Sequence, residues 1–120
     1  MEKIKSFKEL KIWGKGIEIV KYVYPLTKRF PQDELYGLVS QMRRSAVSVP
    51  SNIAEGFKRF HKKEFKQFLH IALGSAAELE TQLEIAKELR FVSRNEYEEL
   101  SEMIDHECRM IQNLRTKLYQ

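Results

Sequence analysis

The chain has 120 residues, of which 42% are hydrophobic and 32% charged, and its formal net charge is +4. This length predicts a single domain, residues 1–120, and the composition is that of a globular protein rather than a disordered one. Uncharged stretches such as residues 45–54 are too short and too polar for a membrane span, and we expect no signal peptide. The single cysteine, Cys108, cannot form an intramolecular disulfide, so we expect a cytoplasmic protein.

The first half of the chain predicts two helices. Apolar residues recur with a helical period over residues 8–29, and the pattern stops at Phe30 because the ring of Pro31 disfavours a helical conformation in the residue before it. The second helix is predicted over residues 32–57. Pro50 lies inside its pattern, removes one backbone hydrogen bond, and is expected to kink the helix rather than end it.

The second half predicts two more helices, over residues 62–89 and 94–118. The last helix begins with Ser93 and Glu96, which have the spacing of a capping box. No segment alternates polar and apolar residues with the period of a strand. Four long helices with short connections predict an all-α protein, an antiparallel up-down-up-down four-helix bundle.

The first helix carries two apolar stripes where one would be enough for a bundle. We assign to the core the stripe formed by Leu10, Trp13, Ile17, Val20 and Tyr24. The adjacent stripe is predicted to form a subunit interface in a homo-oligomer, because a bundle has no further layer to cover it. It contains Ile12, Ile19, Val23 and Leu26. The alternative, a deeply seated helix covered by the N-terminal residues, stays open.

Positive charge concentrates in the first helix and at the turn between the second and third. Residues 1–30 carry eight lysines and arginines against three acidic residues. The turn carries a second cluster between three phenylalanines, and cations beside aromatic rings can bind a phosphate backbone while a ring stacks on a base. Our first candidates for nucleic-acid contact are Lys58, Arg59, Lys62 and Lys63. The alternative is a solvated turn in which Phe57 and Phe65 close the end of the bundle.

The sequence predicts no catalytic or metal site. The three histidines share no ligand spacing with one another, with Cys108, or with a pair of carboxylates. No phosphate-binding loop, dinucleotide fingerprint, zinc protease motif or nucleophile elbow occurs. We therefore expect a protein that is not an enzyme and uses no cofactor.

The centre of the chain resembles a known family. Residues 41–46 read QMRRSA, residues 48–56 read SVPSNIAEG, and residues 72–80 read ALGSAAELE. These runs are similar to the four-helix-bundle proteins encoded in bacterial 23S rRNA intervening sequences, the S23 family, to which the accessory variability determinant (Avd) proteins of diversity-generating retroelements are related. The resemblance covers about residues 7–118. It implies a homopentameric ring without established catalytic activity.

The resemblance leads to two hypotheses of function. One is a non-enzymatic homo-oligomer that binds the backbone of RNA or DNA through its basic surface. The other is a protein-interaction scaffold, with a reverse transcriptase or a ribosomal partner. Within the motif, Arg43 and Arg44 could be phosphate ligands or structural residues. We expect Ser51 and Asn52 to bond the backbone that Pro50 loosens, and Glu55 to pair with a basic side chain.

Overall fold

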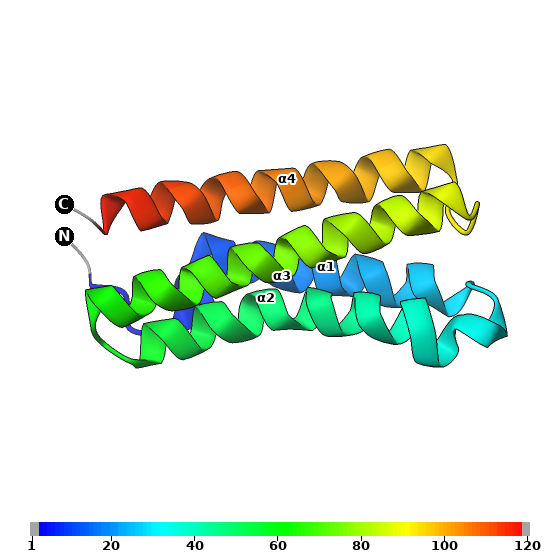
Figure 1. Ribbon diagram of the computed structural model, residues 1–120. Coiled ribbons are helices and arrows are strands. Elements are labelled where there is room, and N and C mark those ends of the chain that lie inside the picture. Colours follow the sequence, from blue (N-terminus) through cyan, green and yellow to red (C-terminus); the bar gives the residue numbers. More distant parts are fainter. Residues whose placement is uncertain (1–2, 119–120) are drawn as a thin grey trace.

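Four long helices run alternately up and down along a body 47 Å long (Figure 1). The structure is a computed structural model that describes residues 3–118, and no strand occurs among them. The helices are α1 (Lys11–Lys28), α2 (Ser40–Lys58), α3 (Lys62–Glu88) and α4 (Arg94–Lys117). A short 3₁₀-helix, η1 (Phe7–Glu9), precedes α1. The predicted all-α, four-helix architecture is confirmed.

The chain between α1 and α2 is less regular than a single helix from residue 32. It forms a 3₁₀ turn, η2 (Gln32–Glu34), and a π-helical turn, η3 (Leu35–Val39), before α2 begins. Gly37 has φ −115° and ψ −109°, outside the helical region, so the axis breaks there. The Glu34 carboxylate accepts a hydrogen bond from the backbone N–H of Leu38 across this break. Regular helix therefore starts eight residues later than the sequence predicts.

The ends of the other helices follow local chemistry. At the start of α4, the Ser93 hydroxyl accepts from the backbone N–H of Glu96, and the Glu96 carboxylate accepts from that of Ser93, so the predicted capping box is present. The helices α2 and α3 are each followed by a residue in the left-handed region, Phe60 (φ 61°) and Arg90 (φ 64°). This conformation terminates a helix, and glycine adopts it at the lowest cost.

Pro50 lies inside α2 without ending it and is buried against α1. A Cβ atom added to Gly16 would lie 3.2 Å from the Pro50 side chain, so the two helices approach closely here. Ser51 and Asn52 donate side-chain hydrogen bonds to backbone carbonyls of the preceding turn, so the expected type of bond is present. Their acceptors are the carbonyls of residues 47 and 48, both at 2.8 Å, rather than the carbonyl of residue 46 that the proline frees.

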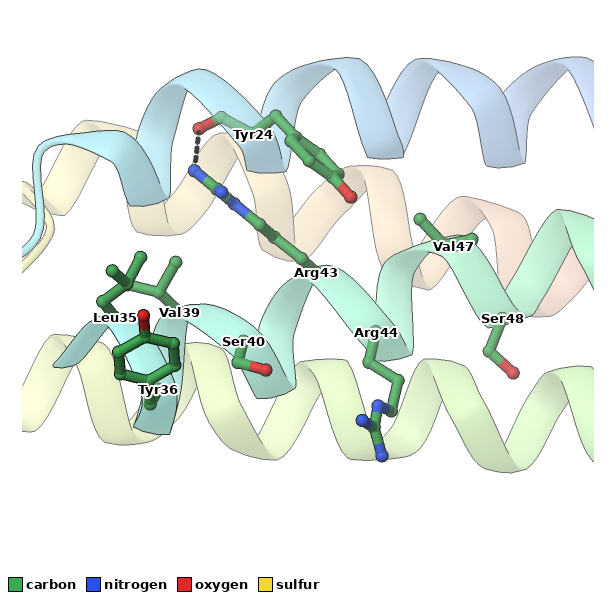
Figure 2. Close-up of a pocket in the computed structure, with 9 residues that line it drawn as sticks. All are labelled: Tyr24, Leu35, Tyr36, Val39, Ser40, Arg43, Arg44, Val47 and Ser48. Carbon is green, nitrogen blue, oxygen red and sulfur yellow. Dashed lines mark hydrogen bonds between the residues drawn. The ribbon is translucent and has the colours of Figure 1, made fainter.

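Arg43 joins α2 to the end of α1 (Figure 2). Its Nε donates to the Thr27 hydroxyl at 3.0 Å, and a terminal nitrogen donates to the Tyr24 carbonyl at 3.3 Å. The guanidinium also lies over the Tyr24 ring, 4.6 Å from its centroid. Thr27 is buried and in turn donates to the carbonyl of Val23. Arg43 therefore fastens α2 to α1, which favours the structural one of its two predicted roles.

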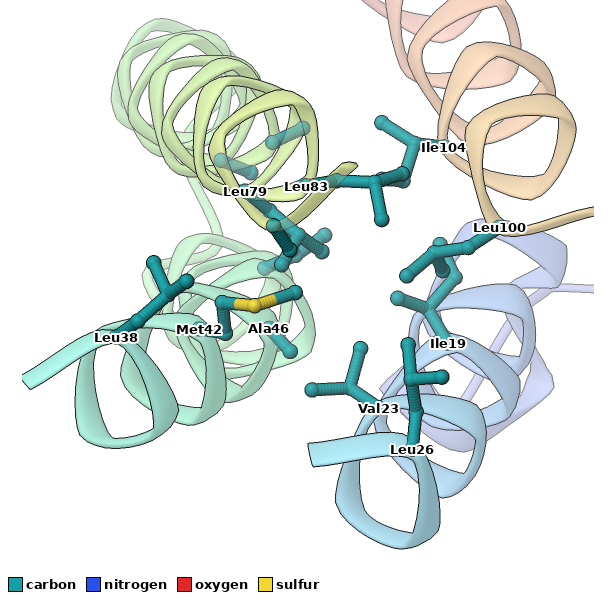
Figure 3. Close-up of a cluster of buried hydrophobic side chains, with 14 of the residues drawn as sticks. Ile19, Val23, Leu26, Leu38, Met42, Ala46, Leu79, Leu83, Leu100 and Ile104 are labelled. Atoms are coloured by element: carbon teal, nitrogen blue, oxygen red, sulfur yellow. The ribbon is translucent and has the colours of Figure 1, made fainter. Parts of the chain in front are cut away.

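The core is a single cluster of aliphatic side chains that point to the common axis of the four helices (Figure 3). The four residues predicted to form a subunit interface belong to it. Ile12, Ile19, Val23 and Leu26 are only 0–4% exposed within one chain. That prediction is wrong, because a residue buried inside the bundle cannot meet another subunit.

The two faces of α1 are thus the reverse of the expected ones. Compact Ile and Val side chains fill the centre, where Gly16 lets α1 approach α2. The stripe assigned to the core lies at the edge of the bundle: Trp13 is half-buried and Tyr24 is exposed. Rings with a polar tip suit such an edge, because one end of the side chain stays in water. α1 therefore has a wide apolar arc, as predicted. The stripe that contains Ile19 and Val23 faces the axis of the bundle, and the adjacent stripe lies at the edge.

Candidate nucleic-acid interface

The turn between α2 and α3 brings the first-choice basic residues together at one end of the bundle. α2 ends at Lys58, and α3 begins at Lys62 after three intervening residues. The four cations at this turn all have exposed side chains; they are Lys58, Arg59, Lys62 and Lys63. These four residues therefore form an exposed cluster at the turn, where the sequence predicted them.

Arg59 differs from the three lysines in having partners within the chain. One of its terminal nitrogens lies 3.0 Å from a Glu55 carboxylate oxygen, and the other lies 3.7 Å from Glu64. Its guanidinium also lies over the Phe68 ring at 5.1 Å. Glu55 thus pairs with a basic side chain, as expected, and does so within its own helix. Arg59 fastens the turn, and the lysines carry its unpaired charge.

No carboxylate among residues 3–118 forms an ion pair with Lys58, Lys62 or Lys63. The ion pairs of the turn are those of Arg59 alone. The start of α3 adds to the positive potential of the turn. No side chain in the described part of the chain caps this helix, since the N-cap residue His61 makes no capping hydrogen bond. First-turn N–H groups without such a cap favour an anion.

The aromatic residues of the turn divide into two half-buried rings and one exposed ring. Phe57 and Phe65 meet edge to face, with ring centroids 6.1 Å apart, and close the end of the bundle. This agrees with the alternative interpretation for those two residues. Phe60 does not join them in the interior: it is 80% exposed, and its ring centroid is 6.5 Å from that of Phe57.

Further cations reach the same end from other elements, because the C-terminal end of α4 lies at the end of the bundle where α3 begins (Figure 1). η1 and the residues before it contribute Lys5 and Lys8, which are exposed. α4 ends here with Lys117, and the Nε of Arg115 donates to the carbonyl of Lys66 on α3 at 3.3 Å. Counted along the sequence, the part of the chain that forms α4 carries more acidic than basic residues. The antiparallel topology nevertheless places its basic end beside the turn.

The two arginines of the family motif lie elsewhere. Arg43 and Arg44 precede Lys58 by about 20 Å along the helix axis, at 1.5 Å per residue. Figure 2 shows Arg43 turned toward α1 and Arg44 turned away from it. Since Arg43 is bound to α1, Arg44 is the one of the two that can present its guanidinium to a ligand. The six predicted contacts therefore form one cluster and one separate pair.

A groove between α1 and α2 was missed by the sequence analysis. Its volume is about 690 Å³, and we call it the α1–α2 groove. Its lining is Tyr24, Leu35, Tyr36, Val39, Ser40, Arg43, Arg44, Val47 and Ser48 (Figure 2). Tyr36 is 93% exposed, and Leu35 and Val47 are also exposed. The irregular turn η3 presents Leu35 and Tyr36 outward, which a regular helical period could not indicate.

One buried carboxyl belongs to neither surface. Glu107 of α4 is fully buried, and neither of its carboxyl oxygens has a hydrogen-bond partner among the described residues. Loss of water raises its pKa to about 8, with Lys15 opposing the shift and Glu18 adding to it. Burial likewise raises the pKa of the Cys108 thiol to about 11, so this cysteine is a poor nucleophile.

The structure shows no cluster suited to a metal ion. Among residues 3–118, no three His, Cys, Asp or Glu side chains lie close enough together to hold one. The histidines are exposed and lie on different elements: His61 at the turn, His70 on α3 and His106 on α4. Within the same residues, none of the helices combines the length and the apolar character that crossing a membrane would need.

Comparison with known proteins places the chain among relatives of the same architecture. The family described as 23S rRNA-intervening sequence protein matches residues 8–113. A crystal structure described as a protein with unknown function from the S23 ribosomal protein family, from Bacteroides thetaiotaomicron VPI-5482, is similar with a TM-score of 0.81. It is 23% identical in sequence, and the match covers 88% of this chain and 95% of that one. At this identity the likeness shows a common fold. A comparison with curated proteins gave no match.

Proposed function

This chain belongs to the 23S rRNA-intervening sequence protein family, and we propose that it is a non-enzymatic, cytoplasmic homo-oligomer that binds the backbone of RNA or DNA. The observation that carries the proposal is the basic end of the bundle, where Lys58, Lys62 and Lys63 are exposed and unpaired among the described residues. The resemblance to the S23 and Avd proteins supports a pentameric ring.

The distribution of ion pairs favours the basic end of the bundle, rather than the opposite end, as the site of phosphate contact. At the opposite end, cations meet carboxylates: Arg29 pairs with Glu96, and the Lys87 ammonium lies 3.0 Å from Glu84. These pairs compensate part of the positive charge there. At the basic end the carboxylates of Glu55 and Glu64 are both engaged with Arg59, which leaves the lysines available to phosphates. Lysine is a flexible point charge, suited to backbone contact rather than to reading base edges.

Assembly would strengthen this field. In a cyclic ring all subunits point the same way, so the basic ends of all copies lie on one side. A net charge of +4 per chain, concentrated in this way, attracts a polyanion far more strongly than a monomer does. The contact between copies cannot use the buried face of α1. The α1–α2 groove, with exposed Leu35, Tyr36 and Val47, is the apolar surface that supports self-association.

The experiment compares how the nucleic-acid affinity of the wild type and of a lysine variant of the turn depends on salt concentration. Binding of a labelled RNA hairpin and a DNA duplex is measured by fluorescence anisotropy between about 50 and 200 mM salt, the range over which phosphate contacts weaken strongly. The variant Lys58→Gln, Lys62→Gln, Lys63→Gln should bind more weakly. The slope of log affinity against log salt should become shallower by about 0.9 for each duplex phosphate that the variant no longer neutralises.

A matched control removes the same charge elsewhere. Lys21→Gln, Lys28→Gln and Arg94→Gln together change the net charge equally at exposed positions outside the basic end. This variant should keep the steep slope of the wild type. Equal weakening in both variants would show that only net charge matters. Unchanged binding in the turn variant would overturn the assignment of the site.

A second candidate function rests on the groove. An exposed apolar surface with two arginines beside it is also suited to a protein partner, which makes the chain a scaffold with incidental nucleic-acid affinity. A reverse transcriptase is the partner that the resemblance to Avd proteins suggests. Wild-type protein that binds neither nucleic acid at about 50 mM salt would favour the scaffold over the first proposal.

A further inference from the structure

Phe60 is a bulky aromatic residue in a position where the backbone favours glycine. Its φ of 61° lies in the left-handed region, where a residue with a Cβ pays a steric cost. Its ring does not offset that cost by burial, because 80% of the residue is exposed. Among the described residues, the ring that lies near it is that of Phe57, at 6.5 Å between centroids. Nothing within the described bundle explains why a phenylalanine stands here.

Arg90 provides a comparison within the same molecule. It occupies the corresponding position after α3 and has almost the same φ, 64°. There the following residue, Phe91, turns inward, packs on Phe30 at 5.4 Å, and bonds its N–H to the Ala86 carbonyl. The apolar ring thus follows the left-handed residue and supports the fold. At the α2 end the order is reversed, and the ring on the left-handed residue itself points to solvent.

The surroundings of the Phe60 ring are cationic. Lys58 precedes it by two residues, and Lys62 and Lys63 follow it by two and three. These are the lysines that have no ion-pair partner among residues 3–118. A flat apolar face with exposed lysines two and three positions away along the chain matches a nucleotide, which has a flat base and a charged phosphate.

We propose that Phe60 is a stacking platform for an unpaired base, so that the preferred ligand of the basic end is single-stranded nucleic acid or the unpaired loop of a folded one. This inference rests on the proposed function and adds the class of ligand. A base can stack on the ring only if it is free of its neighbours in a duplex. The lysines bind the phosphates on either side, as in sites that combine a basic track with aromatic platforms.

The decisive variant is Phe60→Gly, because it removes the ring and relieves the backbone. Stacking on one aromatic residue corresponds to roughly a 5- to 150-fold change in affinity. The affinity of the variant for a labelled twelve-nucleotide oligouridine should fall within that range. Its affinity for a blunt duplex of the same length should stay within about twofold, since the lysines remain. Its melting temperature should not fall, because glycine is the residue best suited to φ 61°.

Two further variants separate stacking from general apolar contact and from backbone effects. Phe60→Trp offers a larger ring and should bind the single strand at least as well as the wild type, whereas Phe60→Leu should lose affinity as the glycine variant does. Arg90→Gly makes the same backbone change at the other end of α3. It should leave the preference for single strands over duplexes unchanged.

Several outcomes would overturn the stacking role while the proposed function stands. In each of them the lysine variant of the turn still weakens binding. Phe60→Gly or Phe60→Leu could bind the single strand as tightly as the wild type, or Phe60→Gly could lose affinity for single strand and duplex alike. A change of oligomer mass in Phe60→Gly by light scattering, with binding per chain intact, would make the ring a subunit contact. If the lysine variant also binds normally, both proposals fail together.

Discussion

Glu107 is the residue whose chemistry departs furthest from its usual state. It lies in the middle of the bundle beside Gly16, on which an added Cβ atom would sit 3.3 Å from a Glu107 carboxyl oxygen. The carboxyl has no partner among residues 3–118, and burial raises its pKa to about 8. At neutral pH the folded protein therefore holds it in the protonated form, since an unpaired buried charge costs several kcal/mol.

This predicts a stability that declines as the pH rises. The folded pKa lies above the unfolded value of about 4.3, so the unfolded chain loses the proton first and gains stability relative to the fold between those two pH values. Glu107→Gln cannot ionise. Its free energy of unfolding, relative to that of the wild type, should rise by on the order of 3 kcal/mol between pH 5 and pH 7.5.

Urea unfolding at several pH values measures this difference. Glu102→Gln, at an exposed position on the same helix, is the control and should show no such trend. A difference between Glu107→Gln and the wild type that stays constant with pH would mean that Glu107 ionises in the folded protein. Lys15, the cation whose charge opposes the shift, would then be the group that stabilises the carboxylate.

The functional residues were only partly predictable from the sequence. Exposure of the lysines at the turn follows from their charge and from the helix ends, so Lys58, Lys62 and Lys63 could be placed. For Arg59, the sequence indicated the ion pair with Glu55 four residues earlier, but not the contact with Phe68 on α3. The engagement of Arg43 could not be predicted, because it depends on Thr27, which lies on α1 and reaches the arginine only through the packing.

At the level of elements, α2 and α3 approach each other closely where α2 nears the turn. A Cβ atom added to Gly56 would lie 2.6 Å from the Cβ of Phe68 and 3.0 Å from a ring carbon of Phe65. A Cβ atom moves only with its backbone, so the two helices would have to separate. The glycine is needed here for close packing rather than for an unusual backbone angle.

A pair of glycine substitutions tests this packing. Gly56→Ala should lower the free energy of unfolding by about 1–3 kcal/mol, the usual cost of overpacking. Gly74→Ala, in the exposed interior of α3 with nothing within 4 Å of the added atom, should raise it by about 1 kcal/mol through helix propensity alone. Thermal unfolding followed by circular dichroism compares the two. A stabilising Gly56→Ala would show that the helices can move apart at little cost.

The reversed faces of α1 show where sequence periodicity stops being informative. Two apolar stripes that lie next to each other both have a helical period, and their spacing does not tell which one faces the axis. The deciding features were the size and polarity of the side chains. Ile19 and Val23 fill the centre, and Trp13 and Tyr24 occupy the edge. The break at Gly37 could not be predicted either, because residues 32–40 keep an unbroken helical pattern.

At the scale of the whole molecule, the unpaired lysines of the turn and the α1–α2 groove occupy different places. The unpaired lysines lie at one end, and the α1–α2 groove lies along the side near the other end (Figures 1 and 2). A ring built through the sides of the bundle leaves its end faces open. Self-association through the groove and nucleic-acid binding through the basic end are therefore compatible, and variants should separate them.

The groove residues are the ones whose substitution should break an assembly without harming the fold. Tyr36→Glu together with Val47→Glu places two charges on exposed positions, where substitutions usually change stability by less than about 0.5 kcal/mol. Light scattering should give the wild type a mass that is a multiple of 14.3 kDa, and the variant the mass of one chain with its helical circular dichroism retained. Val23→Glu, in contrast, should unfold the chain, because it buries a charge in the core.

Gln67→Glu and Thr81→Glu, at exposed positions of α3, are the matched control and should keep the wild-type mass. A double variant at the groove that stays assembled would move the contact to another surface, and a wild type that weighs 14.3 kDa at every concentration would rule out the oligomer.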